Sequence, residues 1–155
     1  MSWCSTADEP GVAAAMARYA LAVDGRDWAE FASQFTEDCY CDYGEPFGVL
    51  RGTGQVEAWA EALHLGLDAS MHRITNILVL EAEQDMAKIS SYVDALFTRG
   101  ERQFHGAGRF ETELRRRGDR WAIARHAFFG MWAEGDFTVL DVAEAVRAVQ
   151  ATPAA

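Results

Sequence analysis

The segment GRFETELRRRGDRWAIAR, residues 108–125, has the pattern of two β-strands joined by a turn at Gly118-Asp119. Its two runs are rich in aromatic and aliphatic residues, which favour strands. Similar runs precede it, and turn signals at Gln84-Asp85 and Gly100-Glu101 separate them. Consecutive strands with short connections pair in the antiparallel sense. The sequence therefore predicts four long antiparallel strands, at residues 72–85, 86–99, 102–117 and 120–132.

Helical patterns dominate the part of the chain before these strands. Apolar residues recur at three- and four-residue steps from about residue 8 to Gly25, which is one face of a helix that Ser5, Thr6 or Asp8 can cap. Further helices are predicted at residues 28–35, capped by Asp27, at residues 55–67 and, at the C-terminus, at residues 136–150. A strand at residues 36–46, which Pro46 ends, lies between the second and third helices.

This order of elements predicts an α+β fold. Helices and an antiparallel sheet are largely segregated along the chain, and a chain of 155 residues fits a single domain, residues 1–155. A strongly twisted sheet of this size can curl around the helices and leave a conical cavity. Concave, mostly apolar cavities are where small molecules bind.

Composition narrows the class of partner. Asp and Glu outnumber Lys and Arg 24 to 14, for a formal charge of −10, which argues against nucleic acid because that surface needs clustered positive charge. The basic run at 115–117 precedes a turn, so it is interpreted as solvated rather than as a phosphate site. No apolar run is long enough to span a membrane, and the first ten residues lack the pattern of a signal peptide.

The three cysteines favour a reducing compartment. Their odd number without a signal peptide predicts free thiols in the cytoplasm. Cys39 and Cys41 share one face of a strand, but no second pair completes a metal site. They are expected to pack as small apolar residues, and no metal site is predicted.

Several motifs together resemble the SnoaL-like branch of the nuclear-transport-factor-2-like superfamily. They are Tyr-x4-Asp followed by Asp-Trp, the Asp-Tyr of CDYGEP, the histidine of SMHRITN, and GRFETELRRRGDRWAIAR. The resemblance covers roughly residues 10–132 and includes scytalone dehydratase, the bile-acid dehydratases and hexachlorocyclohexane dehydrochlorinase. It implies a cone-shaped α+β barrel, a pocket for a small hydrophobic or aromatic molecule, no required metal or organic cofactor, and a homodimer or homotrimer.

The same resemblance implies site residues. Asp24 and His72 match a catalytic Asp–His pair, Tyr19 matches a tyrosine of the bile-acid dehydratases, and Tyr43 matches a tyrosine that polarises the substrate of scytalone dehydratase. Other positions depart from that last enzyme. Its second active-site histidine falls near Phe97 here, and its serine and asparagine fall near Gly108 and Phe110, which puts its substrate in doubt but not the elimination chemistry.

The residues themselves are suited to elimination. A histidine is the usual general base near neutral pH, and a carboxylate that accepts its N–H fixes its tautomer and stabilises the imidazolium. His72 is thus the candidate base and Asp24 its partner. A tyrosine hydroxyl, from Tyr19 or Tyr43, can donate to a carbonyl or a leaving oxygen. Asp24 is also compatible with a solvated helix end, His72 with an edge histidine, and both tyrosines with packing.

Other candidates could bind substrate. His105, which Gly106 and Gly108 follow, could line the cavity or face a subunit interface; His126 could assist a leaving group or pair with a carboxylate outside the sheet. Arg125 is a weaker candidate, and His64, on a helix, is expected to be exposed. If aromatic residues of the last strands line the cavity, the ligand is an apolar ring system. The aromatic substrate-binding candidates are Phe110, Phe128 and Trp132.

The leading hypothesis is a cofactor-independent lyase that removes water from a small hydrophobic or aromatic molecule. Loss of a halide or a retro-aldol cleavage would need the same groups. The first alternative is an isomerase or cyclase in which Asp24 carries the proton. The second is a non-catalytic binding module, in which Asp24 and His72 would not meet.

Overall fold

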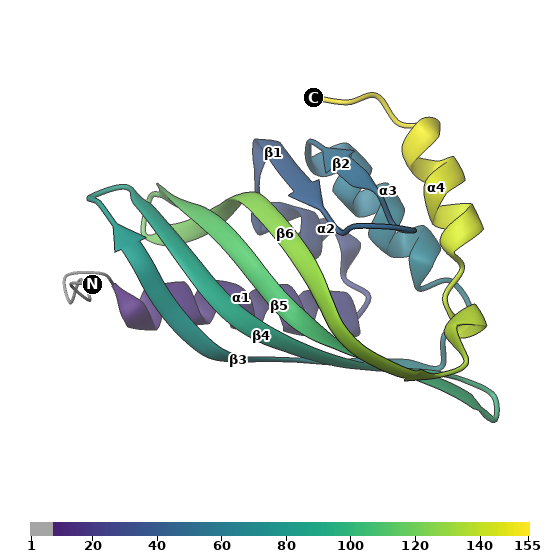
Figure 1. Ribbon diagram of the computed structural model, residues 1–155. Coiled ribbons are helices and arrows are strands. Elements are labelled where there is room, and N and C mark those ends of the chain that lie inside the picture. Colours follow the sequence, from purple (N-terminus) through teal and green to yellow (C-terminus); the bar gives the residue numbers. More distant parts are fainter. Residues whose placement is uncertain (1–7) are drawn as a thin grey trace.

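A computed structural model describes residues 8–155 of the chain. Four helices and six strands form an α+β fold, in which one curved sheet partly encloses the N-terminal helices (Figure 1). Two of the three caps considered for the first helix, Ser5 and Thr6, and also Cys4, lie outside the described residues. The elements, in chain order, are α1 (Glu9–Asp24), α2 (Trp28–Ser33), β1 (Phe35–Asp42), β2 (Val49–Arg51), α3 (Thr53–Leu63), β3 (Ala69–Ala82), β4 (Met86–Arg99), β5 (Arg102–Arg117), β6 (Arg120–Gly135), the 3-10 turn η1 (Phe137–Val139) and α4 (Val142–Gln150).

The helices begin where the sequence predicts caps. The Asp8 carboxylate accepts the backbone N–H of Gly11 at 3.0 Å and so caps α1, and Asp27 caps α2 by accepting from Glu30, also at 3.0 Å. These bonds satisfy N–H groups that have no partner inside the helix. Gly25 ends α1, with its N–H bonded to Leu21 O.

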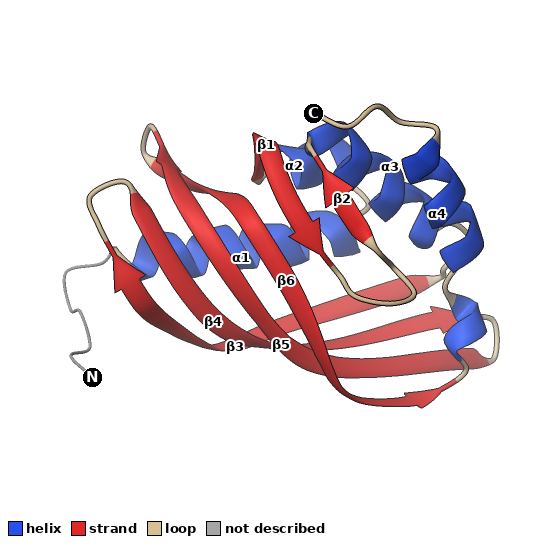
Figure 2. Ribbon diagram, turned by 45° about the horizontal axis from the view of Figure 1, so that its top comes forward, coloured by secondary structure: helices blue, strands red, loops and turns tan. Residues whose placement is uncertain are grey.

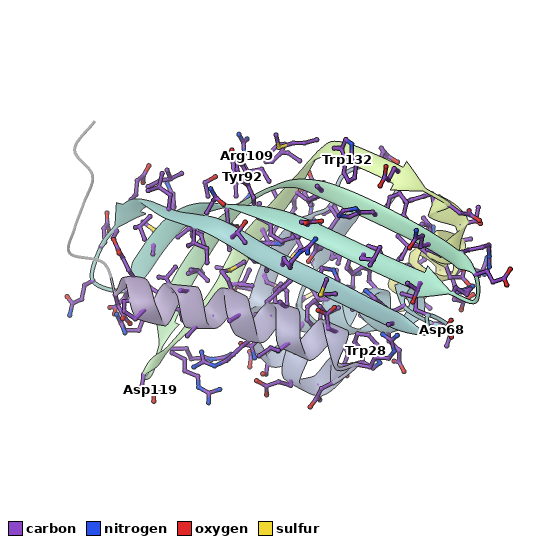
Figure 3. The ribbon with its side chains drawn as sticks, turned by 90° about the horizontal axis from the view of Figure 1, so that it is seen from below. Trp28, Asp68, Tyr92, Arg109, Asp119 and Trp132 are labelled. Carbon is purple, nitrogen blue, oxygen red and sulfur yellow. The ribbon has the colours of Figure 1, made fainter. Side chains whose placement is uncertain are left out.

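The sheet has the order β2-β1-β6-β5-β4-β3 and is mixed. The four long strands pair antiparallel, as predicted, whereas β1 pairs with β6 in parallel. The long strands bend partway along, so that the sheet curls towards the helices (Figure 2). Alternate residues of β4 are buried, which defines an inner face against the helices and an outer face. Tyr92 and Arg109 lie on the outer face, on the side opposite α1 (Figure 3).

A register shift between β5 and β6 helps to bend the sheet. It falls between Ala107 and Gly108, and a Cβ atom added to Gly108 would come within 2.4 Å of the Phe129 carbonyl oxygen. Only glycine permits so close an approach of the two backbones. Here the sheet that forms the pocket wall gains curvature.

Some predicted boundaries were wrong. The third helix runs from Thr53 to Leu63 rather than over 55–67, and strand β2 was not predicted. The predicted C-terminal helix 136–150 is divided: η1 covers 137–139, and α4 begins only at Val142, after its cap Asp141. Asp136 and Asp141 each accept a backbone N–H, so two separate helical starts replace one helix.

The expected packing of the cysteines can be compared with residues 8–155. Cys39 and Cys41 are buried free thiols in the apolar core, as their packing role requires, and no group of three metal-ligating side chains gathers within this part of the chain. Within the same residues, the helices are too short or too polar to cross a bilayer.

Candidate active site

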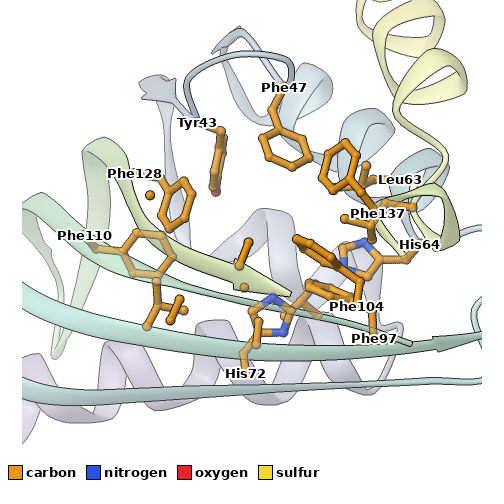
Figure 4. A pocket seen from close by; sticks show the side chains of 18 of the residues that line it. Tyr43, Phe47, Leu63, His64, His72, Phe97, Phe104, Phe110, Phe128 and Phe137 are labelled. Carbon is orange, nitrogen blue, oxygen red and sulfur yellow. The ribbon is translucent and has the colours of Figure 1, made fainter. Parts of the chain in front are cut away.

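A pocket of about 510 Å³ lies between the inner face of the sheet and α1, α2, α3 and η1 (Figure 4). Its walls are mainly aromatic and aliphatic, which suits a small hydrophobic ligand. Phe110 and Phe128, two of the predicted substrate-binding residues, line it; a third, Trp132, also borders the pocket, although its ring packs against His105 on the outer face of the sheet. The polar residues of the wall are Tyr19, Tyr43, Glu45, His64 and His72.

Asp24 and His72 meet at the edge of this pocket. Asp24 is the last residue of α1, and His72 is the fourth residue of the curved strand β3, which packs against α1. The ring N–H at His72 Nδ1 donates to Asp24 Oδ1 at 2.7 Å, and the backbone N–H of His72 donates to Oδ2, also at 2.7 Å. Two bonds to one residue fix both the position and the tautomer of the ring.

Ser70 is a third partner of the Asp24 carboxylate. Its hydroxyl donates to Oδ1 at 2.9 Å. Ser70 and His72 are two residues apart on β3, so their side chains lie on the same face of the strand. Burial raises the pKa of the Asp24 carboxyl, but the hydrogen bonds from His72 and Ser70 and the nearby imidazole outweigh it, and the pKa lies below its usual value. The carboxylate is therefore ionised at neutral pH and acts as an acceptor.

The His72 ring lines the pocket and can contact a bound ligand. With Nδ1 bonded to Asp24, Nε2 is the nitrogen left to meet a ligand. The ring packs edge-on against Phe97, with centroids 5.4 Å apart, and it is largely buried. Asp24 itself does not belong to the pocket wall, so it stands behind His72.

Tyr19 and Tyr43 form a hydroxyl pair in the wall. Tyr19 comes from α1 and Tyr43 from just after β1, and their oxygens are 3.0 Å apart. Burial raises the pKa of both phenols, so both are neutral at neutral pH. One hydroxyl donates to the other, and the second keeps its own hydrogen free for a ligand. Tyr43 and His72 reach into the pocket from opposite sides (Figure 4).

His126 was a candidate for binding substrate, but the structure places it behind the pocket wall. It is fully buried, its Nδ1 bonds to Thr112 Oγ1 at 2.9 Å, and the rings of Tyr19, Tyr43 and Phe110 pack around it. The alternative, a carboxylate partner outside the sheet, is wrong as well. Burial lowers its pKa to about 3, so the ring is neutral and supports the tyrosine pair by packing.

This burial predicts acid-sensitive stability. Unfolded His126 has a pKa of 6.5 and folded His126 a pKa of about 3, so unfolding takes up a proton at pH values between these two. The stabilisation is complete above 6.5 and is lost as the pH falls towards 3. The free energy of unfolding near pH 5 should fall less steeply in His126→Leu than in the wild type, by about 1.4 kcal/mol per pH unit. Parallel pH profiles from denaturant titrations would contradict this.

Two further candidates lie outside the pocket. His105 is on the outer face, where Nε2 bonds to Asp94 and Trp132 packs edge-on to the ring. Asp94 also accepts a bond from Arg73, so this is a surface network. Arg125 is exposed and stacks on the ring of Tyr40, 4.9 Å from its centroid. Neither residue lines the pocket, so a role for them in binding substrate has no support from the geometry.

The expectation that His64 is exposed was wrong. His64 is 3% exposed and lines the pocket, against Trp28, His72 and Phe97. Its place could have been found from periodicity, since it follows the buried Ala60 by four residues and so lies on the same face of the helix.

The sequence matches a known protein family. Residues 5–127 match the model of the SnoaL-like domain, so the chain belongs to this family. The curved α+β sheet over a small-molecule pocket is the nuclear-transport-factor-2-like architecture that the motifs indicated. No curated protein matches the chain.

Solved structures give the particular relatives. A candidate aromatic ring hydroxylase from Novosphingobium aromaticivorans is 25% identical, with a TM-score of 0.80 over 88% of this chain and 98% of that one. A candidate scytalone dehydratase from the same organism is 18% identical, with a TM-score of 0.77 over 83% and 87%. Hexachlorocyclohexane dehydrochlorinase LinA-type3 from Novosphingobium barchaimii is 16% identical, with a TM-score of 0.72 over 83% and 90%. The similarity to the last two proteins is one of fold alone.

Proposed function

We propose that this protein is a cofactor-independent lyase that eliminates water from a small hydrophobic or aromatic molecule. The observation that carries the proposal is the His72 ring, whose Nδ1 is bonded to the Asp24 carboxylate at 2.7 Å and whose other nitrogen is free at the wall of an apolar pocket. A base oriented in this way, with a carboxylate behind it, is what proton abstraction from carbon requires.

In this mechanism, His72 Nε2 takes a proton from a carbon next to a carbonyl group. The electron pair of the C–H bond forms a carbon–carbon double bond as the bond from the neighbouring carbon to the hydroxyl oxygen breaks. The leaving oxygen takes the proton from the His72 imidazolium and departs as water, so the base returns to its first state. Asp24 stabilises the transient imidazolium, and the hydroxyl of Tyr19 or Tyr43 donates to the carbonyl oxygen. A halide could leave by the same proton abstraction, and a retro-aldol cleavage would use the same base.

The tyrosine pair gives a prediction of its own. Tyr19→Phe and Tyr43→Phe should each lower kcat by on the order of 10²-fold, because each hydroxyl polarises the other. The double variant should be scarcely slower than either single variant, since groups in one hydrogen-bonded chain are not additive. Steady-state kinetics of the four proteins measures this; single effects that multiply in the double variant would show that the hydroxyls act independently.

Geometry weighs against the alternatives. An isomerase or cyclase in which Asp24 moves the proton would need a free carboxylate facing the ligand, yet both Asp24 oxygens accept hydrogen bonds and the residue stands outside the wall. A pure binding module has no need of a histidine held by an ionised carboxylate. The names of the structural relatives cover several reactions, so they do not choose among them.

A substrate screen tests the proposal. Aromatic β-hydroxy ketones, with matched β-chloro ketones, are incubated with the protein, and the conjugated enone product is followed by its absorbance. We expect turnover of at least one hydroxy ketone without added metal or cofactor. Tight binding of these compounds without turnover of any would instead favour the binding module.

The predicted homodimer or homotrimer also stays a prediction. Exposed apolar side chains on the outer face of the sheet, Tyr92 and Phe129 among them, give it some support. Sedimentation equilibrium would give the subunit number.

A further inference from the structure

His64 carries a buried nitrogen with no partner. Its Nδ1 is bonded to the carbonyl oxygen of Ala60 at 2.7 Å, one helical turn earlier in α3. Its Nε2 is buried and makes no hydrogen bond to any of the described residues 8–155. A buried polar atom without a partner is unfavourable, so such an atom in a pocket wall needs an explanation.

The bond to Ala60 fixes what Nε2 can do. A carbonyl oxygen only accepts, so Nδ1 carries the hydrogen and Nε2 carries the lone pair. Burial lowers the pKa of His64 to about 4, and the nearby His72 and Arg26 act in the same direction, so the ring is neutral at neutral pH. Nε2 is therefore a hydrogen-bond acceptor that has no donor among the described residues.

The His64 ring faces the pocket, so a donor group on a bound ligand could reach Nε2. The His64 ring points from α3 towards the pocket, beside Phe97 and Phe104 (Figure 4). Its centroid is 6.1 Å from that of His72, so the two rings lie side by side in the pocket wall. A ligand with no hydrogen-bond donor at this end of the pocket would leave His64 Nε2 unsatisfied.

We propose that His64 is a specificity-determining residue that accepts a hydrogen bond from a hydroxyl group of the ligand, so that the site selects hydroxylated apolar ring compounds. The further step, that this hydroxyl is the leaving group, rests on the proposed function. When His64 holds the hydrogen of the hydroxyl, an oxygen lone pair turns towards the protonated His72, which supplies the proton for the departing water.

Binding of 2-naphthol and naphthalene, which differ by one hydroxyl group, tests the inference without any turnover. The dissociation constants of both probes are measured by quenching of intrinsic tryptophan fluorescence. His64→Leu is expected to weaken 2-naphthol binding by about tenfold, the value of one good hydrogen bond, and to leave naphthalene binding nearly unchanged. His64→Gln, whose amide oxygen can replace Nε2 as acceptor, should keep much of the preference. The backbone N–H of His64 still bonds to Ala60 O in both variants.

His72→Phe is the matched control, because it removes the neighbouring histidine of the pocket wall and leaves His64 in place. If His64→Leu weakens the binding of both probes equally, or of neither, the inference is wrong. It is also wrong if only His72→Phe removes the preference for 2-naphthol.

A measurement on the wild type keeps the inference testable if a variant does not fold. The ¹⁵N resonance of His64 Nε2 should move with 2-naphthol but not with naphthalene, and equal shifts would overturn the inference. Failure of the proposed function would appear separately, as normal turnover by His72 variants.

Discussion

His72→Ala is expected to lower kcat by about 10²- to 10⁴-fold while leaving the fold and the affinity for the ligand largely intact. The loss follows from the removal of the only nitrogen that is both free to take a proton in the pocket and held by the Asp24 carboxylate within residues 8–155. The small effect on binding follows from the walls, since most of the contact area there is aromatic and aliphatic. Single-turnover kinetics with saturating substrate measures the chemical step alone.

His105→Ala is the matched control for this variant. His105 is also bonded to a carboxylate, that of Asp94, but it lies on the outer face of the sheet. Removal of this pair should leave kcat unchanged within about twofold, because surface substitutions away from the site have small effects. If His72→Ala retains normal turnover, His72 is not the base.

Asp24→Asn is expected to be the second most damaging change, with kcat lowered on the order of 10³-fold, as when a neutral amide replaces the carboxylate behind a catalytic histidine. The amide has one acceptor oxygen, whereas the carboxylate accepts three hydrogen bonds with two. The ring of His72 can then take the other tautomer, which puts the hydrogen rather than the lone pair on Nε2. The free energy of unfolding should fall by about 1–3 kcal/mol as well.

Asp119→Asn provides the comparison, since Asp119 is at the exposed tip of the β5–β6 hairpin (Figure 3). It removes the same charge far from the pocket. An Asp24→Asn variant as active as Asp119→Asn would exclude a role for the carboxylate in turnover, and one that loses stability but not kcat would make Asp24 a purely structural residue.

The hairpins could be predicted because their signals are local. Gly118-Asp119 and the runs on either side are neighbours in sequence, and β5 and β6 pair across that turn as expected. The parallel pairing of β1 with β6 joins Phe35 to Ile123, and no local pattern in either strand announces it. The short strand β2 was missed for a similar reason, as three residues are too few to show a period.

The residues of the site divide in the same way, into those with a local sequence signal and those without one. Asp24 and His72 were paired through the resemblance to a family, since nothing in their own surroundings indicated that residues 48 positions apart would meet. His64 was misjudged because a polar residue near the end of a helix is usually solvated, and only the packing of Trp28 and Phe97 against it makes it part of the wall. Ser70 gave no signal beyond its alternation with His72.

The mass of the product, measured for the wild type and for His72→Ala side by side, is the decisive test of the proposed elimination. We expect a wild-type product lighter than its substrate by one molecule of water, and almost none of it from the variant in the same time. A product of the same mass as the substrate would make the protein an isomerase or cyclase. Equal amounts of dehydrated product from both proteins would show that the His72–Asp24 pair does not carry the reaction.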